Sequence, residues 1–268
     1  MIVVRTETQA SRYTIAVCKG TAFLEETKAL LRAWQPGESP TEFRHRVLRE
    51  DLLGRMTAYR ASDIVRRVFA WRFLRPDNRP AILLKRLIER GQPGQIFSDL
   101  CFLYAARNDD LIRDAVTHLY WPSLSEGRLH LSPAYVVEFL RQADQDGRVP
   151  EPWTEQVKLK VARGVLKALT DFGLLREIGR GKRELVHFRP ADQTIVYLAH
   201  DIHFSGSTDA SIIGHRDWAL FGSRSRDVAS ALDRLSGEGW WLAQIAGTLI
   251  RVTWKYASME EVVDAIAR

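Results

Sequence analysis

The sequence predicts a mainly helical protein of the α+β class, with an N-terminal helical bundle and a C-terminal domain that contains short β-hairpins. Apolar residues recur at helical spacing through long segments of the first half of the chain. In the second half, two helical segments each end at a glycine and lead into strand-like runs that flank a turn. The chain has 268 residues, of which 46% are hydrophobic, so two domains can each bury a core.

Helices are expected throughout the first half. The segment Ser39-Pro40-Thr41-Glu42 gives the clearest start signal, because Ser39 can cap a helix, Pro40 suits its first position and Glu42 completes a capping box. Proline and glycine residues separate the other segments. The expected helices cover residues 21–34, 40–53, 58–74, 81–89, 96–106 and 109–120, and Pro122 is expected to end the last of them.

A polar, turn-rich stretch at residues 123–127 marks the expected domain boundary. It predicts a helical domain over residues 1–125 and a second domain over 126–268. Ser132 and Pro133 begin a helix that is expected to run to about residue 143. The second domain therefore also opens with helical structure.

A longer helix follows, capped by Thr154 and stopped by Gly173. Strand-like runs at 174–178 and 184–188 then flank a Gly-Arg-Gly-Lys turn at 179–182, which predicts a hairpin. The apolar stripe of the helix consists of Val157, Val161, Val165, Leu169 and Phe172.

The same pattern occurs again near the C-terminus. Leucines precede Gly239 at the same spacings as those before Gly173, and strand-like runs at 241–245 and 248–254 come next. A second helix–hairpin unit is therefore expected at about 225–256. Its hairpin tip is Ala-Gly and carries no cation, so we interpret this unit as structural or as a partner surface.

A helix, a glycine stop and a basic-tipped hairpin form the second half of a winged helix, in which the helix enters the major groove of DNA and the hairpin reaches the adjacent backbone. The spacing places three cations on one face of the helix that Thr154 caps, opposite its apolar stripe. The candidate contacts in this region are Lys158, Lys160, Arg163 and Lys167 on the helix and Arg180, Lys182 and Arg183 at the wing. The alternative is a solvated helix face in a structural winged helix that contacts proteins.

A second basic region lies in the expected helices at 40–53 and 58–74, where arginines outnumber acids. Arg60 and Arg67 are seven residues apart with Asp63 between them, and Arg66 is adjacent. Arginine suits bidentate phosphate contacts, so Arg60, Arg66 and Arg67 are candidate nucleic-acid ligands. The alternative is pairing of Asp63 with Arg66 or Arg67 within the helix.

Other function classes lack support in the sequence. There is no phosphate-binding glycine loop and no nucleophile elbow, so we predict no catalytic residue, cofactor or small-molecule substrate. His200 and His203 could share a helix face, but no third ligand is fixed, so we predict no metal site.

The tryptophans near the C-terminus are interpreted as core rather than as a base-stacking platform. Two cysteines at no ligand spacing, no signal segment and no membrane-length apolar run favour a soluble, cytoplasmic protein. The net charge of +6 favours an anionic partner.

The sequence resembles the BrxA family of the BREX phage-defence systems. The resemblance rests on the order of several segments spread over most of the chain. They are Gly-Thr-Ala-Phe-Leu-Glu-Glu-Thr at 20–27, Phe-Arg-His-Arg-Val-Leu-Arg-Glu-Asp-Leu-Leu at 43–53, Ser-Asp-Ile-Val-Arg-Arg-Val-Phe-Ala-Trp-Arg at 62–72, Arg-Asp-Trp-Ala-Leu-Phe-Gly at 216–222 and Arg-Val-Thr-Trp-Lys-Tyr at 251–256 before Ser258.

This resemblance implies an N-terminal domain similar to the antitermination factor NusB, followed by a winged-helix-like domain. It implies a non-enzymatic accessory protein that binds double-stranded DNA, with other BREX components as partners. Members of the family were once labelled inner-membrane proteins, but this sequence has no membrane-length apolar run, so we expect no membrane association. Phosphate contacts would dominate, because the Thr154 helix shows no obvious base-reading set. The alternatives are an RNA-binding protein of the NusB type, a protein-interaction adaptor and, with no acidic cluster to support it, a metal-dependent nuclease.

Overall fold

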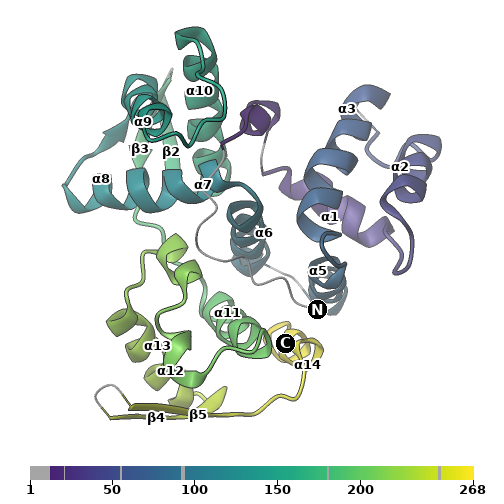
Figure 1. Cartoon of the computed structure of the whole chain (residues 1–268). Coiled ribbons are helices and arrows are strands. Elements are labelled where there is room, and N and C mark those ends of the chain that lie inside the picture. Colours follow the sequence, from purple (N-terminus) through teal and green to yellow (C-terminus); the bar gives the residue numbers. More distant parts are fainter. Residues whose placement is uncertain (1–12, 21, 55, 92–93, 180, 247–248) are drawn as a thin grey trace. The chain divides into compact units, whose positions relative to one another are not determined.

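The structure is a computed structural model that describes residues 13–20, 22–54, 56–91, 94–179, 181–246 and 249–268 (Figure 1). It confirms the mainly helical α+β class, since helices predominate and two small antiparallel sheets accompany them. The chain forms two compact units. Unit 1 combines the described residues up to Ala22 with Ala105–Phe188, and unit 2 combines Phe23–Tyr104 with Arg189–Arg268.

These units do not divide at residue 125, where the sequence suggested a domain boundary. Residues 105–125 belong with the segment that follows them, because the backbone N–H of Phe188 donates to the Tyr120 hydroxyl at 3.2 Å. Ser123, in the stretch expected to be a linker, is only 1% exposed and lies within a helix. Polar composition at 123–127 therefore reflects the end of a helix and a turn inside unit 1.

Unit 1 contains a helical segment, a short strand, two helices and a β-hairpin in that order. The hairpin strands pair antiparallel, and the short strand adds to the hairpin in the order β1-β3-β2. The elements are the 3-10 helix η1 (Ile15–Lys19), α7 (Asp110–Asp114), the π-helical segment η3 (Ala115–Tyr120), α8 (Trp121–Ser125), β1 (His130–Leu131), α9 (Pro133–Gln145), α10 (Glu155–Asp171), β2 (Leu175–Gly179) and β3 (Lys182–Leu185).

Local sequence explains the two longest helices of unit 1. The Ser132 hydroxyl accepts from the N–H of Tyr135 at the start of α9, and the Thr154 hydroxyl accepts from the N–H of Val157 at the start of α10. Gly173 has φ +83°, a left-handed conformation that glycine adopts without strain, and it turns the chain from α10 toward β2. The predicted helices and hairpin are therefore present, with the second strand at 182–185 instead of 184–188.

Pro122 does not end the helix before it, contrary to the sequence prediction. The segment Ala115–Tyr120 is π-helical, and the N–H of Trp121 donates to the carbonyl of Val116, five residues earlier. A π turn changes the hydrogen-bonding register just where proline would interrupt an α-helix. The helix consequently continues as α8 to Ser125.

Unit 2 is built from helices of both ends of the chain and one hairpin. Its N-terminal part comprises α1 (Leu24–Ala33), α2 (Pro40–Arg49), α3 (Ala58–Ile64), the π-helical segment η2 (Val65–Phe69), α4 (Ala70–Phe73), α5 (Arg79–Arg90) and most of α6 (Gly94–Asn108). Its C-terminal part comprises α11 (Asp192–Phe204), α12 (Asp209–Ile212), the 3-10 helix η4 (Arg216–Phe221), α13 (Ser225–Gly237), β4 (Trp241–Ala246), β5 (Leu249–Trp254) and α14 (Met259–Ile266).

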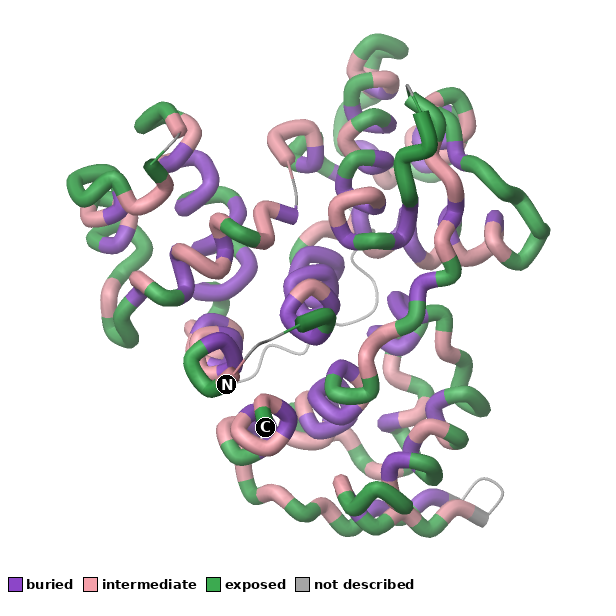
Figure 2. The backbone as a smooth tube through the Cα atoms, turned by 180° about the vertical axis from the view of Figure 1, so that it is seen from behind, coloured by how far each residue is buried: buried purple, intermediate pink, exposed green. Residues whose placement is uncertain are grey.

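Polar contacts join the two parts of unit 2 at buried or half-buried positions. The Asp99 carboxylate of α6 accepts from the N–H of Ala191 at 2.9 Å and from the Thr194 hydroxyl at 2.8 Å, at the start of α11. Arg86 of α5 donates two hydrogen bonds, of 2.5 and 2.6 Å, to the Asp264 carboxylate of α14. Buried and exposed residues alternate along the helices of this unit, as expected of helices with one side in a core (Figure 2). Unit 2 therefore needs residues that are far apart in sequence.

The expected second helix–hairpin unit is present in unit 2. Helix α13 leads through Gly239 into β4 and β5, which pair from Trp241–Trp254 to Ala246–Leu249. The indole N–H of Trp241 donates to the carbonyl of Leu232 at 2.8 Å, which fixes the hairpin on the helix. Trp218 and Trp241 are each 3% exposed, as expected of core residues, whereas Trp240 and Trp254, which were also expected in the core, are only half-buried.

Candidate nucleic-acid interface

Helix α10 presents three cations on one exposed face. Lys160, Arg163 and Lys167 are all exposed, whereas the stripe of Val161, Val165 and Leu169 on the other side is fully buried. Lys167 forms an ion pair with Asp171, one turn further along the helix. Within the described residues, the side chains of Lys160 and Arg163 have neither an ion pair nor a hydrogen bond. The helix therefore offers two cations whose charge no neighbouring acid neutralises.

Lys158 does not belong to this face, contrary to the sequence prediction. Lys158 is only 7% exposed, and its Nζ lies 2.9 Å from Asp144 Oδ2 of α9 and 3.4 Å from Glu155 Oε1. Position 158 precedes Val161 and Val165 by three and seven residues, so it lies on the buried side of the helix. Lys158 holds α9 and α10 together and is not available to a ligand.

Of the three cations predicted at the hairpin of β2 and β3, the structure describes Lys182 and Arg183, and only Lys182 is exposed. Lys182 is exposed and has no acidic partner in the described part of the chain. Arg183 is half-buried, and its Nε donates to the Thr170 hydroxyl of α10 at 3.2 Å. Arg180 lies outside the described residues. Ile178 is 47% exposed, so the hairpin combines a cation with an apolar side chain near its tip.

The N-terminal segment is packed beside this surface, a feature that the sequence analysis did not identify. A Cβ on Gly164 of α10 would lie 3.1 Å from the carbonyl oxygen of Val17, so glycine lets η1 approach the helix closely. Tyr13 anchors the segment, because its hydroxyl donates to Asp114 Oδ2 at 2.9 Å and its N–H donates to the carbonyl of Arg148 at 2.8 Å. Burial and the Asp114 carboxylate raise the pKa of the Tyr13 hydroxyl. Glycine inside a helix was the available signal.

The second candidate group, on α3 and η2, is partly occupied by local contacts. Arg67 Nε lies 2.6 Å from Asp63 Oδ1, and Arg66 is 4.0 Å from the same atom. Arg60 lies over the ring of Phe23, 5.0 Å from its centroid. The predicted pairing of Asp63 with its arginine neighbours is therefore present, although Arg66 and Arg67 remain 60% and 48% exposed.

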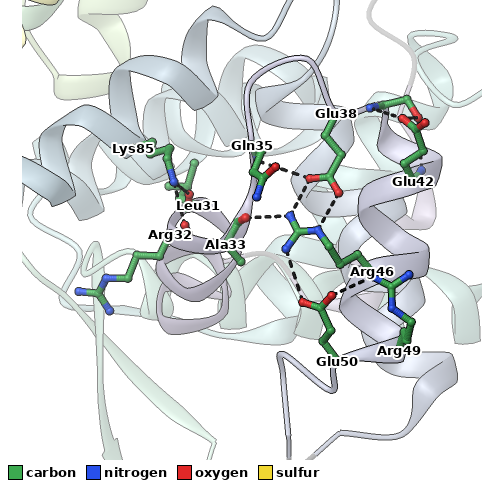
Figure 3. A network of polar contacts seen from close by, with 11 residues as sticks. Leu31, Arg32, Ala33, Gln35, Glu38, Glu42, Arg46, Arg49, Glu50 and Lys85 are labelled. Atoms are coloured by element: carbon green, nitrogen blue, oxygen red, sulfur yellow. Dashed lines mark hydrogen bonds and ion pairs between the residues drawn. The ribbon is translucent and has the colours of Figure 1, made fainter.

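The arginines of α2 are largely structural. Arg46 donates to both carboxylate oxygens of Glu38 at 2.8 and 2.7 Å and to the carbonyl of Ala33 at 2.8 Å, which ties α2 to the end of α1 (Figure 3). Arg49 donates to Glu50 at 2.8 Å. The Arg46 guanidinium holds the pKa of the Glu38 carboxyl below its usual value. These ion pairs remove part of the basic excess that the sequence suggested.

The histidines and cysteines form no metal centre in the part of the chain that the structure describes. His200 is fully buried, and its Nδ1–H donates to the carbonyl of Val196 at 2.8 Å. Burial lowers the pKa of His200 to about 4, so the ring is neutral at pH 7. Cys101 is buried and Cys18 is half-buried, and burial raises the pKa of both thiols. No described helix is long and apolar enough to cross a membrane.

Comparison with known proteins gives one family match. The BrxA family model matches residues 11–201, which is more than half of the chain. No curated protein matches the sequence. A crystal structure of an uncharacterized protein from Magnetospirillum magneticum is similar in fold, with a TM-score of 0.57 and 18% identity over 72% of this chain and 95% of that chain. On the strength of the family match, the chain belongs to the BrxA family, and this membership indicates a role in BREX phage defence.

Proposed function

We propose that the chain is a non-enzymatic accessory protein of BREX phage defence that binds duplex DNA through unit 1. This proposal is supported by the element order of unit 1, from α7 through β1, α9 and α10 to the β2–β3 hairpin, and by the strand order β1-β3-β2, which are the orders expected for a winged helix. In such a domain α10 would lie in the major groove and the hairpin would contact the neighbouring phosphates.

The exposed cations of α10 are the observation that carries this proposal. Lys160 and Arg163 have no acidic partner among the described residues, and Lys182 adds a similar charge on the hairpin. Each cation that neutralises a phosphate releases condensed counterions, so affinity should fall steeply with salt. Lysines dominate this set and bind phosphate as point charges, so we expect weak sequence preference.

Charge reversal on α10 tests the proposal. Replacing Lys160, Arg163 and Lys167 with Glu should abolish binding to a fluorescent duplex of mixed sequence, measured by anisotropy across a salt series. The matched control replaces three exposed arginines of unit 2, Arg216, Arg226 and Arg251, with Glu, which changes the net charge equally. The control should retain most of the duplex affinity, because its substitutions lie outside the winged helix.

The same salt series separates the alternatives. An unchanged duplex affinity in the folded α10 variant would remove this helix from the interface. Tighter binding of a structured RNA than of the duplex would favour an RNA-binding protein. An absence of binding to either nucleic acid at low salt would leave a protein-interaction adaptor within the defence system.

A further inference from the structure

An exposed row of aromatic and arginine side chains runs along the helix formed by α3, η2 and α4 in unit 2. We name it the Tyr59–Arg75 stripe. It consists of Tyr59, Arg66, Arg67 and Trp71 on the helix and of Arg75, which lies two residues beyond the end of α4. Tyr59 is 75% exposed and Trp71 is 49% exposed, although both rings are large and apolar enough to be buried in most proteins. The neighbours on the opposite side of the helix, Ile64, Val65, Val68, Phe69 and Phe73, form the core.

The π-helical segment η2 creates this alignment. The N–H of Ala70 donates to the carbonyl of Val65, five residues earlier, so one extra residue is accommodated in the turn. An extra residue rotates the following helix by about 100° relative to an uninterrupted α-helix. Without that rotation Trp71 would turn from the exposed face toward the core. Single π turns of this kind are frequent at functional sites.

The stripe carries a net positive charge. Its cations are Arg66, Arg67 and Arg75, and Asp63 is the single acid between Thr57 and Arg75 in the sequence. The other two arginines of this segment lie outside the stripe, because Arg72 is buried and Arg60 is half-buried over the Phe23 ring. Asp63 is only 8% exposed and lies beneath Arg67, so the stripe presents no exposed carboxylate. The guanidinium of Arg75 lies 5.3 Å from the centroid of the Trp71 ring, which keeps a cation beside an exposed aromatic face.

Exposed rings interleaved with arginines match the chemistry of a single-stranded nucleic acid. Unpaired bases stack on aromatic faces, and guanidinium groups bind the phosphates between them. Tyr59 and Trp71 are twelve residues apart, or about 18 Å along a helix, which equals roughly five stacked nucleotides at about 3.4 Å each. In a duplex the bases are already stacked on one another, so their faces are not accessible to the Tyr59 and Trp71 rings.

We propose that the Tyr59–Arg75 stripe binds single-stranded DNA, with bases stacked on Trp71 and Tyr59 and phosphates held by Arg66 and Arg75. This site is separate from the α10 surface and uses stacking, which the α10 surface does not. The choice of DNA over RNA rests on the function proposed for unit 1, since a protein that binds duplex DNA also meets its separated strands. The stacking surface itself does not depend on that function.

The test measures binding of the full chain to a labelled, unstructured DNA strand by anisotropy, with an RNA strand of the same sequence and the DNA duplex alongside. Replacing Tyr59 and Trp71 together with Ala should weaken single-strand binding roughly tenfold or more. Trp71→Phe should retain most of the affinity, because a ring remains. Replacing Arg66 and Arg75 with Ala should reduce the logarithmic salt slope by about 0.7 for each lost phosphate contact.

Controls make the outcome specific. Leu242→Ala removes an apolar side chain that is 58% exposed on β4, and Arg251→Ala removes an exposed cation of β5, so both should leave single-strand affinity unchanged. The Tyr59 and Trp71 substitutions are then repeated in the charge-reversed α10 variant. Unit 1 should not bind phosphates in that variant, so the remaining single-strand affinity comes from the stripe. Duplex affinity then reports on α10 and single-strand affinity reports on the stripe, so the two proposals can fail separately.

Two results would overturn the proposal. Equal single-strand affinity of the native chain and the folded Tyr59 and Trp71 double variant would exclude base stacking at this face. Stripe-dependent binding that favours the RNA strand over the DNA strand would show that the occupant is RNA. A third result would support the proposal instead. If the α10 variant lost duplex binding but kept its single-strand binding, the stripe would be an independent site.

Discussion

Two lysines of α10 that look equivalent in the sequence differ in their exposure to solvent. Lys158 and Lys160 are two positions apart, and the helical pattern suggested a common role for both. Their surroundings differ, because the Lys158 ammonium lies close to the carboxylates of Asp144 on α9 and Glu155 on α10, whereas Lys160 is exposed to solvent. The periodicity of α10 identified the exposed cations, but the position of the acid on the neighbouring helix was not available from one sequence.

His200 makes stability depend on pH. Its ring is enclosed by aromatic side chains, with the Trp254 centroid at 4.8 Å and the Trp241 centroid at 5.4 Å. Because burial lowers the pKa of His200 from 6.5 to about 4, the unfolded chain takes up a proton at higher pH than the folded chain does. The contribution of neutral His200 to the free energy of unfolding is therefore fully present above pH 6.5 and is lost as the pH falls toward 4.

We expect the free energy of unfolding at pH 4 to be lower than at pH 7 by about 3 kcal/mol on account of His200 alone. Urea unfolding at both pH values measures the difference. His200→Phe removes the titrating group and should reduce the pH dependence by about that amount. An identical pH dependence in the native chain and the variant would show that His200 is not the responsible group.

At the scale of elements, the sequence predicted most helices and both hairpins correctly. Capping signals at Ser39, Ser132 and Thr154 are all used by the structure. The two π turns were not predicted, because the apolar spacing of an uninterrupted helix and of a helix with one π turn differ by a single residue. Trp71 was therefore not recognised as exposed, and the stripe that includes it was missed. The strand β1 was missed because it has two residues.

The packing of α5 on the C-terminal helix depends on the absence of a side chain at Gly91. A Cβ at this position would lie 2.5 Å from the backbone oxygen of Ala267, which cannot move aside without displacing α14. We expect Gly91→Ala to lower the free energy of unfolding by about 1–3 kcal/mol, measured by urea denaturation.

Gly237 provides the matched control for that substitution. It lies in α13, and a Cβ there would meet nothing within 4 Å. Gly237→Ala should raise stability by about 0.5–1 kcal/mol, because alanine favours the helix and restricts the unfolded chain. If both substitutions had the same sign, the contact with Ala267 would not be the cause of the Gly91 effect.

At the scale of the whole molecule, the chain is interleaved in a way that local composition could not reveal. The buried pair of Tyr104 and Tyr197 hydroxyls, 2.7 Å apart, joins residues that are 93 positions apart in sequence. Such long-range contacts determine which residues belong to each compact unit, whereas composition and periodicity describe only residues that are close together in the sequence. The position of a boundary is therefore the part of the fold that was hardest to predict.

A fragment of residues 1–125 should fail to fold cooperatively, because it lacks the partners of α5 and α6 from residues 189–268 and the sheet of unit 1. Thermal unfolding followed by circular dichroism should show a broad, weak transition in the fragment and a sharp one in the full chain. A sharp transition in the fragment would instead support an independent N-terminal domain.

The interleaving also sets an order of events during synthesis. Every part of unit 1 has been translated once residue 188 leaves the ribosome, whereas unit 2 must wait for its last helix, α14. Until then the faces of α5 and α6 that later receive α14 and α11 are uncovered. Segments in this state are prone to association, so the incomplete chain is more liable to aggregate than the complete one.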